Sequence, residues 1–152
     1  MNINNKFICK ILQLLHIFLG IGGFYGGISL LIQPNGDLLQ LPLSLLSSSP
    51  FPNFTIPGII LVILFGISPI VTSVALFFKW NWNGISSLTV FKDKHWSWNF
   101  SLYIGFALII WITVQAYLIK SFSTIQLIYS FLGIGILIFT LLPSVQSFYK
   151  IK

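Results

Sequence analysis

The chain has 152 residues, of which 56% are hydrophobic and only 7% are charged. About a quarter of the residues in soluble domains are charged, so this composition excludes an ordinary water-soluble protein. The net charge of +6 comes from eight lysines and two aspartates, and the lysines are scattered rather than gathered with stacking aromatic residues. A nucleic-acid partner is therefore not expected.

Long apolar runs divide the chain into four expected membrane spans. Unsatisfied backbone groups cost several kcal/mol each in hydrocarbon, and apolar runs without alternation satisfy these groups by forming helices. A bilayer core about 30 Å thick needs roughly 20 apolar residues at 1.5 Å per residue. The runs that qualify are 11–32, 57–78, 100–119 and 125–142. We therefore predict an all-α fold, a transmembrane four-helix bundle that forms a single integral membrane domain over residues 1–152.

The first apolar run follows Lys6 and Lys10 and could be confused with a secretory signal. It continues beyond about 20 residues, the length of a full span, and Gly20 to Phe24 offers a poor cleavage site of small residues. We expect the run to remain as a span, which makes the number of crossings even.

An even number of spans places both termini and the connection from Lys79 to Asn99 on one side of the membrane. The side that holds the termini carries seven lysines: Lys6, Lys10, Lys79, Lys92, Lys94, Lys150 and Lys152. The opposite side carries only Lys120. An excess of lysine marks the cytoplasmic side. Indole rings favour the membrane interface, and four of the five tryptophans lie in the same connection: Trp80, Trp82, Trp96 and Trp98. We therefore predict cytoplasmic termini.

The segment from Gln33 to Ile56 is predicted to face outward and is unusually apolar for a loop. Pro34 to Asp37 predicts a turn, and Leu38 to Leu46 predicts a short segment that lies in the membrane interface. Three prolines favour extended backbone before and at the start of the second span: Pro50, Pro52 and Pro57. We expect a long, proline-rich outer loop between the first and second helices.

Glycines in the spans indicate where helices pack. Gly20, Gly23 and Gly27 share one stripe of the first span, and this spacing permits close approach of two backbones. Packing against another span of the same chain is favoured over a dimer seam, and Gly133 and Gly135 are candidate contacts in the fourth span.

Pro69 lies near the middle of the second span, where it removes an amide donor and clashes with the carbonyl of Phe65. The sequence therefore predicts a kink. A broken helix that builds a transport site is the functional alternative, but a single proline more often marks only a packing kink.

Ionisable side chains are nearly absent from the predicted spans. His16 is the candidate, and we expect it to tilt towards the interface or to bond a neighbouring helix. A haem held by His16 and His95 is not expected, because His95 lies in a connection rather than on a facing helix. Cys9 and His16 are too far apart along a helix for one metal ion, and Cys9 is expected to be an inert thiol. No catalytic residue, cofactor or metal ligand is predicted.

Polar and aromatic residues gather at the predicted outer mouth of the bundle. Trp111 and Gln115 are four residues apart and share one face of the third span. Asp37 is the acid and Lys120 the base on the outer side, so we predict that they pair and hold the loop over the bundle. The candidate interaction site consists of Asp37, Asn53, Phe54, Trp111, Gln115 and Lys120.

The outer loop carries most of a resemblance to small four-span bacterial membrane proteins of no known activity. The matching residues are Gly26 to Leu30, Pro34 to Gly36, Leu41, Pro42, Leu45, Leu46, Ser49 to Phe51, Phe54, Ile56 to Leu61 and Trp111 to Gln115. A more distant likeness to DoxX-type four-span proteins rests on length and on the glycine-containing first helix. The resemblance implies the bacterial inner membrane.

Three classes of function are weighed. The favoured class is an accessory or interaction protein whose helices and outer loop dock a lipid, a membrane-protein partner or a second copy. The alternative is a small oligomeric channel or transporter for an ion or small solute, which the outer polar rim and Pro69 support. A membrane enzyme is disfavoured, because the sequence shows no nucleophile with a base, no carboxylate pair and no metal cluster.

Overall fold

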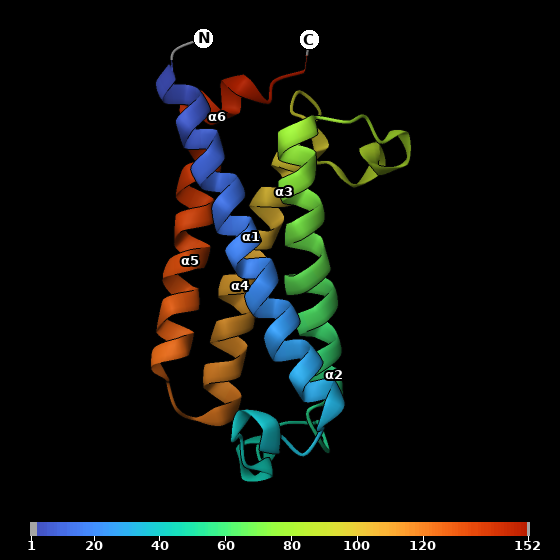
Figure 1. Ribbon diagram of the computed structural model, residues 1–152, viewed down its shortest axis with the longest axis vertical. Helices are drawn as coiled ribbons and strands as arrows, with labels where there is room; N and C mark the ends of the chain where they lie inside the picture. Colours follow the sequence, from blue (N-terminus) through green and yellow to red (C-terminus); the bar gives the residue numbers. More distant parts are fainter. Residues whose placement is uncertain (1–2, 152) are drawn as a thin grey trace.

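The computed structural model describes residues 3–151 and is helical along most of its length (Figure 1). Four helices are long and apolar enough to cross a membrane: Lys6–Ile32, Thr55–Phe78, Trp96–Ile119 and Thr124–Leu141. Within residues 3–151 the extended pairing is limited to an isolated antiparallel bridge between Lys94 and Lys150. The expected all-α class with four long apolar helices is confirmed.

The helical elements differ in length and in type. In chain order they are α1 (Ile3–Ile32), η1 (Asp37–Leu39), η2 (Leu43–Leu46), α2 (Thr55–Ile60), η3 (Leu61–Ile67), α3 (Ser68–Phe78), η4 (Asn83–Leu88), α4 (Trp96–Ile119), α5 (Thr124–Leu141) and α6 (Pro143–Phe148). The second long helix is therefore continuous through α2, η3 and α3. Each long helix begins before the apolar run that predicted it, because hydropathy marks only the part of a helix that matches the hydrocarbon.

The bundle has two distinct ends. Figure 1 shows both termini and the connection 79–95 at one end, called here the terminal end. The segment 33–54 and the turn 120–123 lie at the other end, called here the loop end. The terminal end carries the lysines of the predicted cytoplasmic side, except that Lys152 lies outside the described residues. This arrangement agrees with an even number of crossings.

The glycines of α1 allow it to approach the second long helix closely. A Cβ atom at Gly23 would lie 2.2 Å from the carbonyl oxygen of Phe65, and one at Gly27 would lie 2.8 Å from that of Gly58. Backbones can come this close only where no side chain intervenes. The preference for packing within the chain is therefore confirmed for this stripe. Gly133 of α5 likewise faces α4, because a Cβ atom added at Gly133 would lie 3.4 Å from the carbonyl oxygen of Gly105.

A change of helix type occurs where the sequence predicts a kink. The stretch η3 (Leu61–Ile67) is π-helical, and Pro69 follows it at the start of α3. Proline cannot donate a hydrogen bond to the carbonyl four residues earlier, and a π-helical turn changes the spacing of donors and acceptors. The irregularity before Pro69 is thus a π-helical stretch rather than an interruption of the helix.

A chain of hydrogen bonds crosses the interior of the terminal half. His16 is fully buried, and its Nε2 atom lies 2.8 Å from Ser101 Oγ. Ser101 Oγ lies 2.6 Å from Thr140 Oγ1, and the Trp98 indole N–H donates to the Thr140 carbonyl at 2.8 Å. These bonds link α1, α4 and α5. The expectation that His16 bonds a neighbouring helix is confirmed.

Candidate functional site

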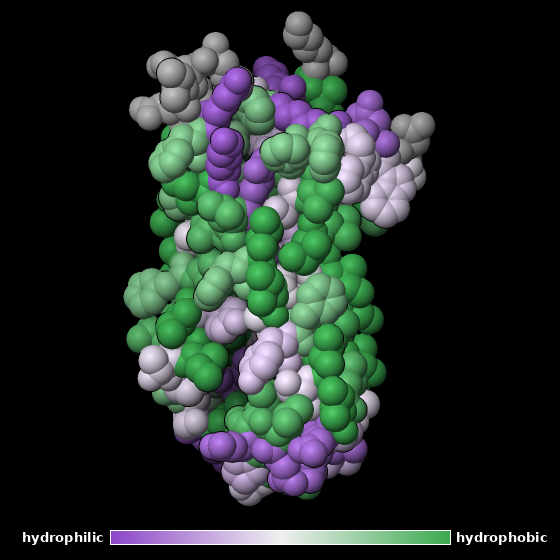
Figure 2. Space-filling view, in the orientation of Figure 1, coloured by the Kyte–Doolittle hydropathy of each residue, from purple (hydrophilic) through white to green (hydrophobic). Residues whose placement is uncertain are grey.

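A cavity of about 580 Å³ lies in the loop-end half of the bundle. Figure 2 shows the surface hollowed in the lower half of the view, between the positions that α5 and α1 occupy in Figure 1. The walls come from α1, η3, α4 and α5, and the segment 33–54 covers the loop end. The volume falls within the range of about 300–1,000 Å³ that is typical of small-molecule sites.

Most of the cavity wall is apolar. The segment 33–54 contributes Leu39, Leu41, Leu45, Leu46, Phe51 and Phe54. The helices add apolar side chains that include Leu19, Leu61, Phe65, Leu108 and Ile112. Among the described lining residues none carries a formal charge. The loop-end cavity is therefore suited to an apolar, uncharged occupant.

The segment 33–54 covers the cavity because its own backbone folds it back. The Phe54 amide donates to the Pro34 carbonyl at 2.9 Å, which joins the two ends of the segment. Gly36 adopts a φ of 86° before η1, a left-handed conformation that glycine accepts without strain. The Leu41 amide then donates to the Gly36 carbonyl at 3.0 Å. This compact loop places its leucines and phenylalanines against the cavity.

The indole of Trp111 supplies an unsatisfied polar group in this wall. Its Nε1 atom is buried and has no hydrogen-bond partner among the described residues. Buried donors are nearly always paired, and an unpaired one costs about 1–3 kcal/mol. Gln115 lies one helical turn further along α4 and also lines the cavity, and its side chain makes no hydrogen bond within the described part of the chain. The Trp111 indole and the Gln115 side-chain amide therefore offer hydrogen-bond donors beside a mostly apolar space.

Aromatic contacts hold the cavity wall in place on both sides. The rings of Trp111 and Phe65 are 6.2 Å apart between centroids, and Phe65 belongs to the π-helical stretch η3. Tyr129 of α5 stacks on Phe18 of α1 at 6.4 Å, and its hydroxyl occupies the space beside Gly22. Tyr129 therefore bridges α5 and α1 on the side where the surface is hollowed.

The six residues of the predicted interaction site separate into two groups. Phe54, Trp111 and Gln115 line the loop-end cavity together. Asn53 instead accepts a hydrogen bond from the Thr55 amide at 3.0 Å, at the start of α2. Asp37, Asn53 and Lys120 are not among the residues that line the cavity.

The predicted ion pair between Asp37 and Lys120 is wrong. Within residues 3–151 the ion pair of the structure joins Asp93 and Lys94, with 3.0 Å between Asp93 Oδ2 and Lys94 Nζ. The Asp37 carboxylate accepts a hydrogen bond from the side-chain Nδ2 of Asn35 instead. Asp37 and Lys120 are both exposed, and exposed ion pairs contribute little to stability, so nothing draws these side chains together.

Sequence reasoning missed the wall residues that lie far from Trp111 along the chain. Phe65 and Tyr129 read from the sequence as ordinary apolar positions of two other spans. The leucine-rich outer loop was a usable signal, since an apolar loop needs an apolar surface to cover. No short sequence pattern indicated that the tilted helices would leave a cavity beneath this loop.

Neither a search for metal-binding groups nor a comparison with known proteins identifies a ligand for the candidate site. Among the residues that the structure describes, no group of three or more His, Cys, Asp or Glu side chains could hold a metal ion. Comparison of the chain with protein-family models, curated proteins and solved structures gives no match. The candidate site is therefore defined by its own geometry.

Proposed function

We propose that the protein binds an uncharged lipid that carries a carbonyl group, and holds part of it in the loop-end cavity. The observation that carries this proposal is the buried Trp111 N–H, which has no partner among the described residues and adjoins a mostly apolar cavity. A carbonyl oxygen would satisfy this donor. The hydrocarbon part of the same molecule would fill the space between the leucine and phenylalanine side chains.

The absence of charge among the described lining residues supports an uncharged ligand. An ionised phosphate or carboxylate is costly to bury unless a cation pairs with it. Ester and ketone carbonyls accept hydrogen bonds without this cost. Gln115 offers an amide N–H close to the Trp111 indole and can donate to the same polar group.

The hollow between α1 and α5 supports entry of the ligand from the bilayer (Figure 2). An acyl or isoprenoid chain could leave the cavity there without meeting water. The segment 33–54 would then shield the opposite end of the cavity from the aqueous phase. We accordingly assign the protein to the accessory and interaction class, with a lipid as the partner.

In this proposal the protein lies in the bacterial inner membrane with the terminal end at the cytoplasm. The lysines at the terminal end support this orientation through the positive-inside rule. The segment 33–54 would then be the proline-rich outer loop, and the cavity would lie in the outer half of the membrane.

Solute transport receives less support from the geometry. The loop-end cavity ends within the bundle, because the interior towards the terminal end is filled by completely buried side chains of three helices. These include Leu12 and His16 of α1, Trp98 of α4 and Ile136 of α5. A transport path would need these side chains to separate.

The test is to replace the donor while keeping the aromatic ring. Trp111→Phe removes the indole N–H, and we expect retention of a copurifying neutral lipid to fall about fivefold or more. Trp80→Phe is the matched control and should retain the lipid, because Trp80 is exposed at the terminal end and lines neither pocket. Mass spectrometry of the protein purified in mild detergent gives the ratio of lipid to protein. Equal retention by the two variants, or no bound lipid in the parent protein, would refute the proposal.

A further inference from the structure

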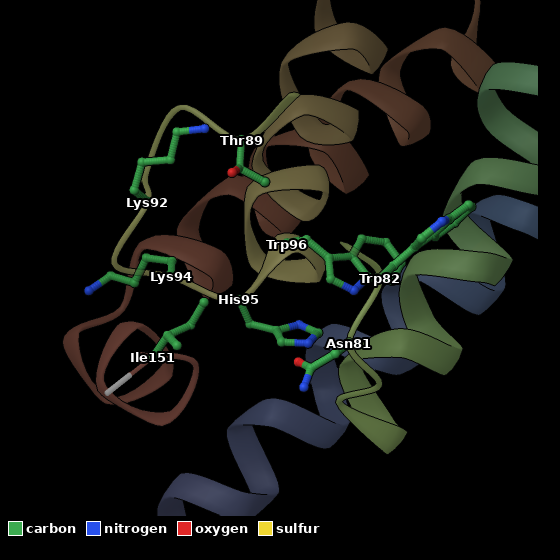
Figure 3. A pocket seen from close by; sticks show the side chains of 8 residues that line it. All are labelled: Asn81, Trp82, Thr89, Lys92, Lys94, His95, Trp96 and Ile151. Atoms are coloured by element: carbon green, nitrogen blue, oxygen red, sulfur yellow. The ribbon is translucent and has the colours of Figure 1, made fainter. Parts of the chain in front are cut away.

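A second pocket, of about 430 Å³, lies at the terminal end between the connection 79–95 and the C-terminal residues (Figure 3). It shares no lining residue with the loop-end cavity. In Figure 3, Trp82, Trp96 and the ring of His95 lie on one side of this terminal pocket, and Lys92 and Lys94 lie on the other. The pocket thus has an aromatic side and a cationic side.

Hydrogen bonds fix the aromatic side of the terminal pocket. The His95 Nε2 and Trp96 Nε1 atoms both donate to the carbonyl oxygen of Trp80, at 3.1 and 2.9 Å. The Trp82 and Trp96 rings meet edge to face, with 5.7 Å between centroids. Little reorganisation of these rings is therefore needed when a ligand binds.

Backbone pairing fixes the frame on the cationic side. Lys94 forms an antiparallel bridge with Lys150, the His95 amide donates to the Tyr149 carbonyl at 2.8 Å, and the Ile151 amide donates to the Asp93 carbonyl at 2.9 Å. These bonds hold the connection 79–95 against the end of the chain. The backbone that presents Lys92 and Lys94 is consequently held in place.

The polar lining of the terminal pocket favours an anion. Its polar lining residues include Lys92, Lys94, Asn81 and Thr89, and no carboxylate is among the described lining residues. In Figure 3 the ammonium group of Lys94 points away from the aromatic side. Asp93 is adjacent and pairs with Lys94 at 3.0 Å. The Asp93 side chain is 56% exposed and that of Lys94 is 12% exposed, so solvent reaches the pair from the Asp93 side and a second anion can share or replace this carboxylate.

We propose that the terminal pocket binds the phosphate group of an amphiphilic anion at the membrane interface. The ammonium group of Lys92 would face the phosphate, and that of Lys94 would join it by turning from Asp93. The indoles of Trp82 and Trp96 would lie beside the less polar part of the molecule. The headgroup and ester region of an anionic phospholipid have this division of charge and apolar surface. A soluble organic phosphate offers the same charged group without the apolar part.

The experiment compares lipids and variants of the full-length protein in detergent. Native mass spectrometry would follow titration with phosphatidylglycerol, with phosphatidylcholine of the same acyl chains, and separately with glycerol 3-phosphate. We expect the parent protein to prefer phosphatidylglycerol. The double variant Lys92→Gln/Lys94→Gln should weaken this binding about tenfold or more, because each lysine near an anionic headgroup contributes substantially.

The matched control is the double variant Lys10→Gln/Lys150→Gln. It removes the same charge from exposed side chains at the same end, but neither residue lines the terminal pocket. Its binding of phosphatidylglycerol should stay within about threefold of the parent value, in keeping with weak exposed charge interactions. Thermal unfolding of both variants checks that the fold is retained, and the single substitutions allow the same comparison if one double variant unfolds.

The outcomes separate the two sources of phosphate. Binding of phosphatidylglycerol without binding of glycerol 3-phosphate would identify a lipid headgroup, and binding of glycerol 3-phosphate that depends on Lys92 and Lys94 would identify a soluble phosphate. Equal binding of the two phospholipids by the parent protein, without binding of glycerol 3-phosphate, would overturn the proposal. The same loss in both double variants would also overturn it. The proposal does not depend on the loop-end cavity, so Trp111→Phe should leave this binding unchanged.

Discussion

At the scale of single residues, buried side-chain hydrogen bonds determine how the terminal half packs. Ser101 lies between His16 and Thr140 and is itself completely buried. Ser101→Ala would leave His16 Nε2 without its partner and would remove a bond from Thr140. We expect the free energy of unfolding to fall by about 1–3 kcal/mol, measured by denaturant unfolding in detergent micelles.

Thr113→Ala is the control for this substitution on the same helix. The Thr113 hydroxyl donates to the Ile109 carbonyl at 2.8 Å, so it bonds its own helix and joins no other element. The side chain is exposed, and its removal should change the free energy of unfolding by less than about 0.5 kcal/mol. If Thr113→Ala lowered the free energy of unfolding as much as Ser101→Ala does, the hydrogen bonds between helices through Ser101 would contribute no more than a bond within one helix.

The glycines of α1 offer a second residue-scale prediction. Gly23→Ala would place a methyl group against the backbone of Phe65, so α1 and η3 must separate or distort. We expect a loss of about 1–3 kcal/mol in the free energy of unfolding, as for other overpacked positions. The melting temperature in detergent, followed by circular dichroism, provides a rapid check.

Gly26→Ala is the matched comparison, one helical turn from the same contact. Its added Cβ would lie 3.6 Å from Leu61 Cδ1, an ordinary van der Waals distance. Alanine is also the better helix former, so the melting temperature should stay equal or rise. Destabilisation by both substitutions to the same extent would refute the close-packing argument.

At the scale of elements, the start of α4 depends on an uncharged histidine. His95 is the N-cap residue, and its Nδ1 atom accepts a hydrogen bond from the Ser97 amide at 3.3 Å. Burial lowers the pKa of His95 below its usual value of 6.5. As the pH falls below about 6.5, the unfolded chain takes up a proton that the folded chain resists, so stability decreases. Above that pH the contribution of His95 is complete.

The prediction is that the melting temperature falls between pH 7.5 and pH 5.5, and that His95→Asn reduces this fall. Asparagine can cap the helix but does not titrate. The chain has a second histidine, His16, so the measured quantity is the difference in pH dependence between the parent and the variant. Identical pH dependence in the two proteins would exclude His95 as the group responsible.

Sequence reasoning located the long helices better than it described their internal form. Hydropathy and the glycine stripe depend on local composition, so they identified the spans and the face of α1 that packs. Pro69 predicted an irregularity at the right place, but no local sequence signal indicated that it would take the form of the π-helical stretch η3, which packs against Gly23 and Gly27 of α1. The η1 and η2 turns of the segment 33–54 were expected only as a turn and an interfacial segment.

At the scale of the whole molecule, the two ends differ in what the sequence could reveal about them. The loop-end cavity brings together Phe54, Trp111 and Gln115 of the predicted outer-mouth residues. The pairing of Asp37 with Lys120 failed because the predicted direction of the spans fixes the level of a residue in the bundle but not its distance from another residue. The cavity itself results from the tilt of α1 across the bundle, which no short sequence pattern encodes (Figure 1).

The orientation of the bundle gives the last prediction. Cys9 is buried, with 3% of its surface exposed, and can be replaced by alanine to give a background without thiols. Ser48 in the segment 33–54 and Ser87 in the connection 79–95 are both exposed and lie at opposite ends. With the terminal end in the cytoplasm, a membrane-impermeant maleimide should label Ser48→Cys in intact bacterial spheroplasts. It should label Ser87→Cys only after the membrane is disrupted, and the reverse pattern would show that the lysine-rich terminal end faces outward.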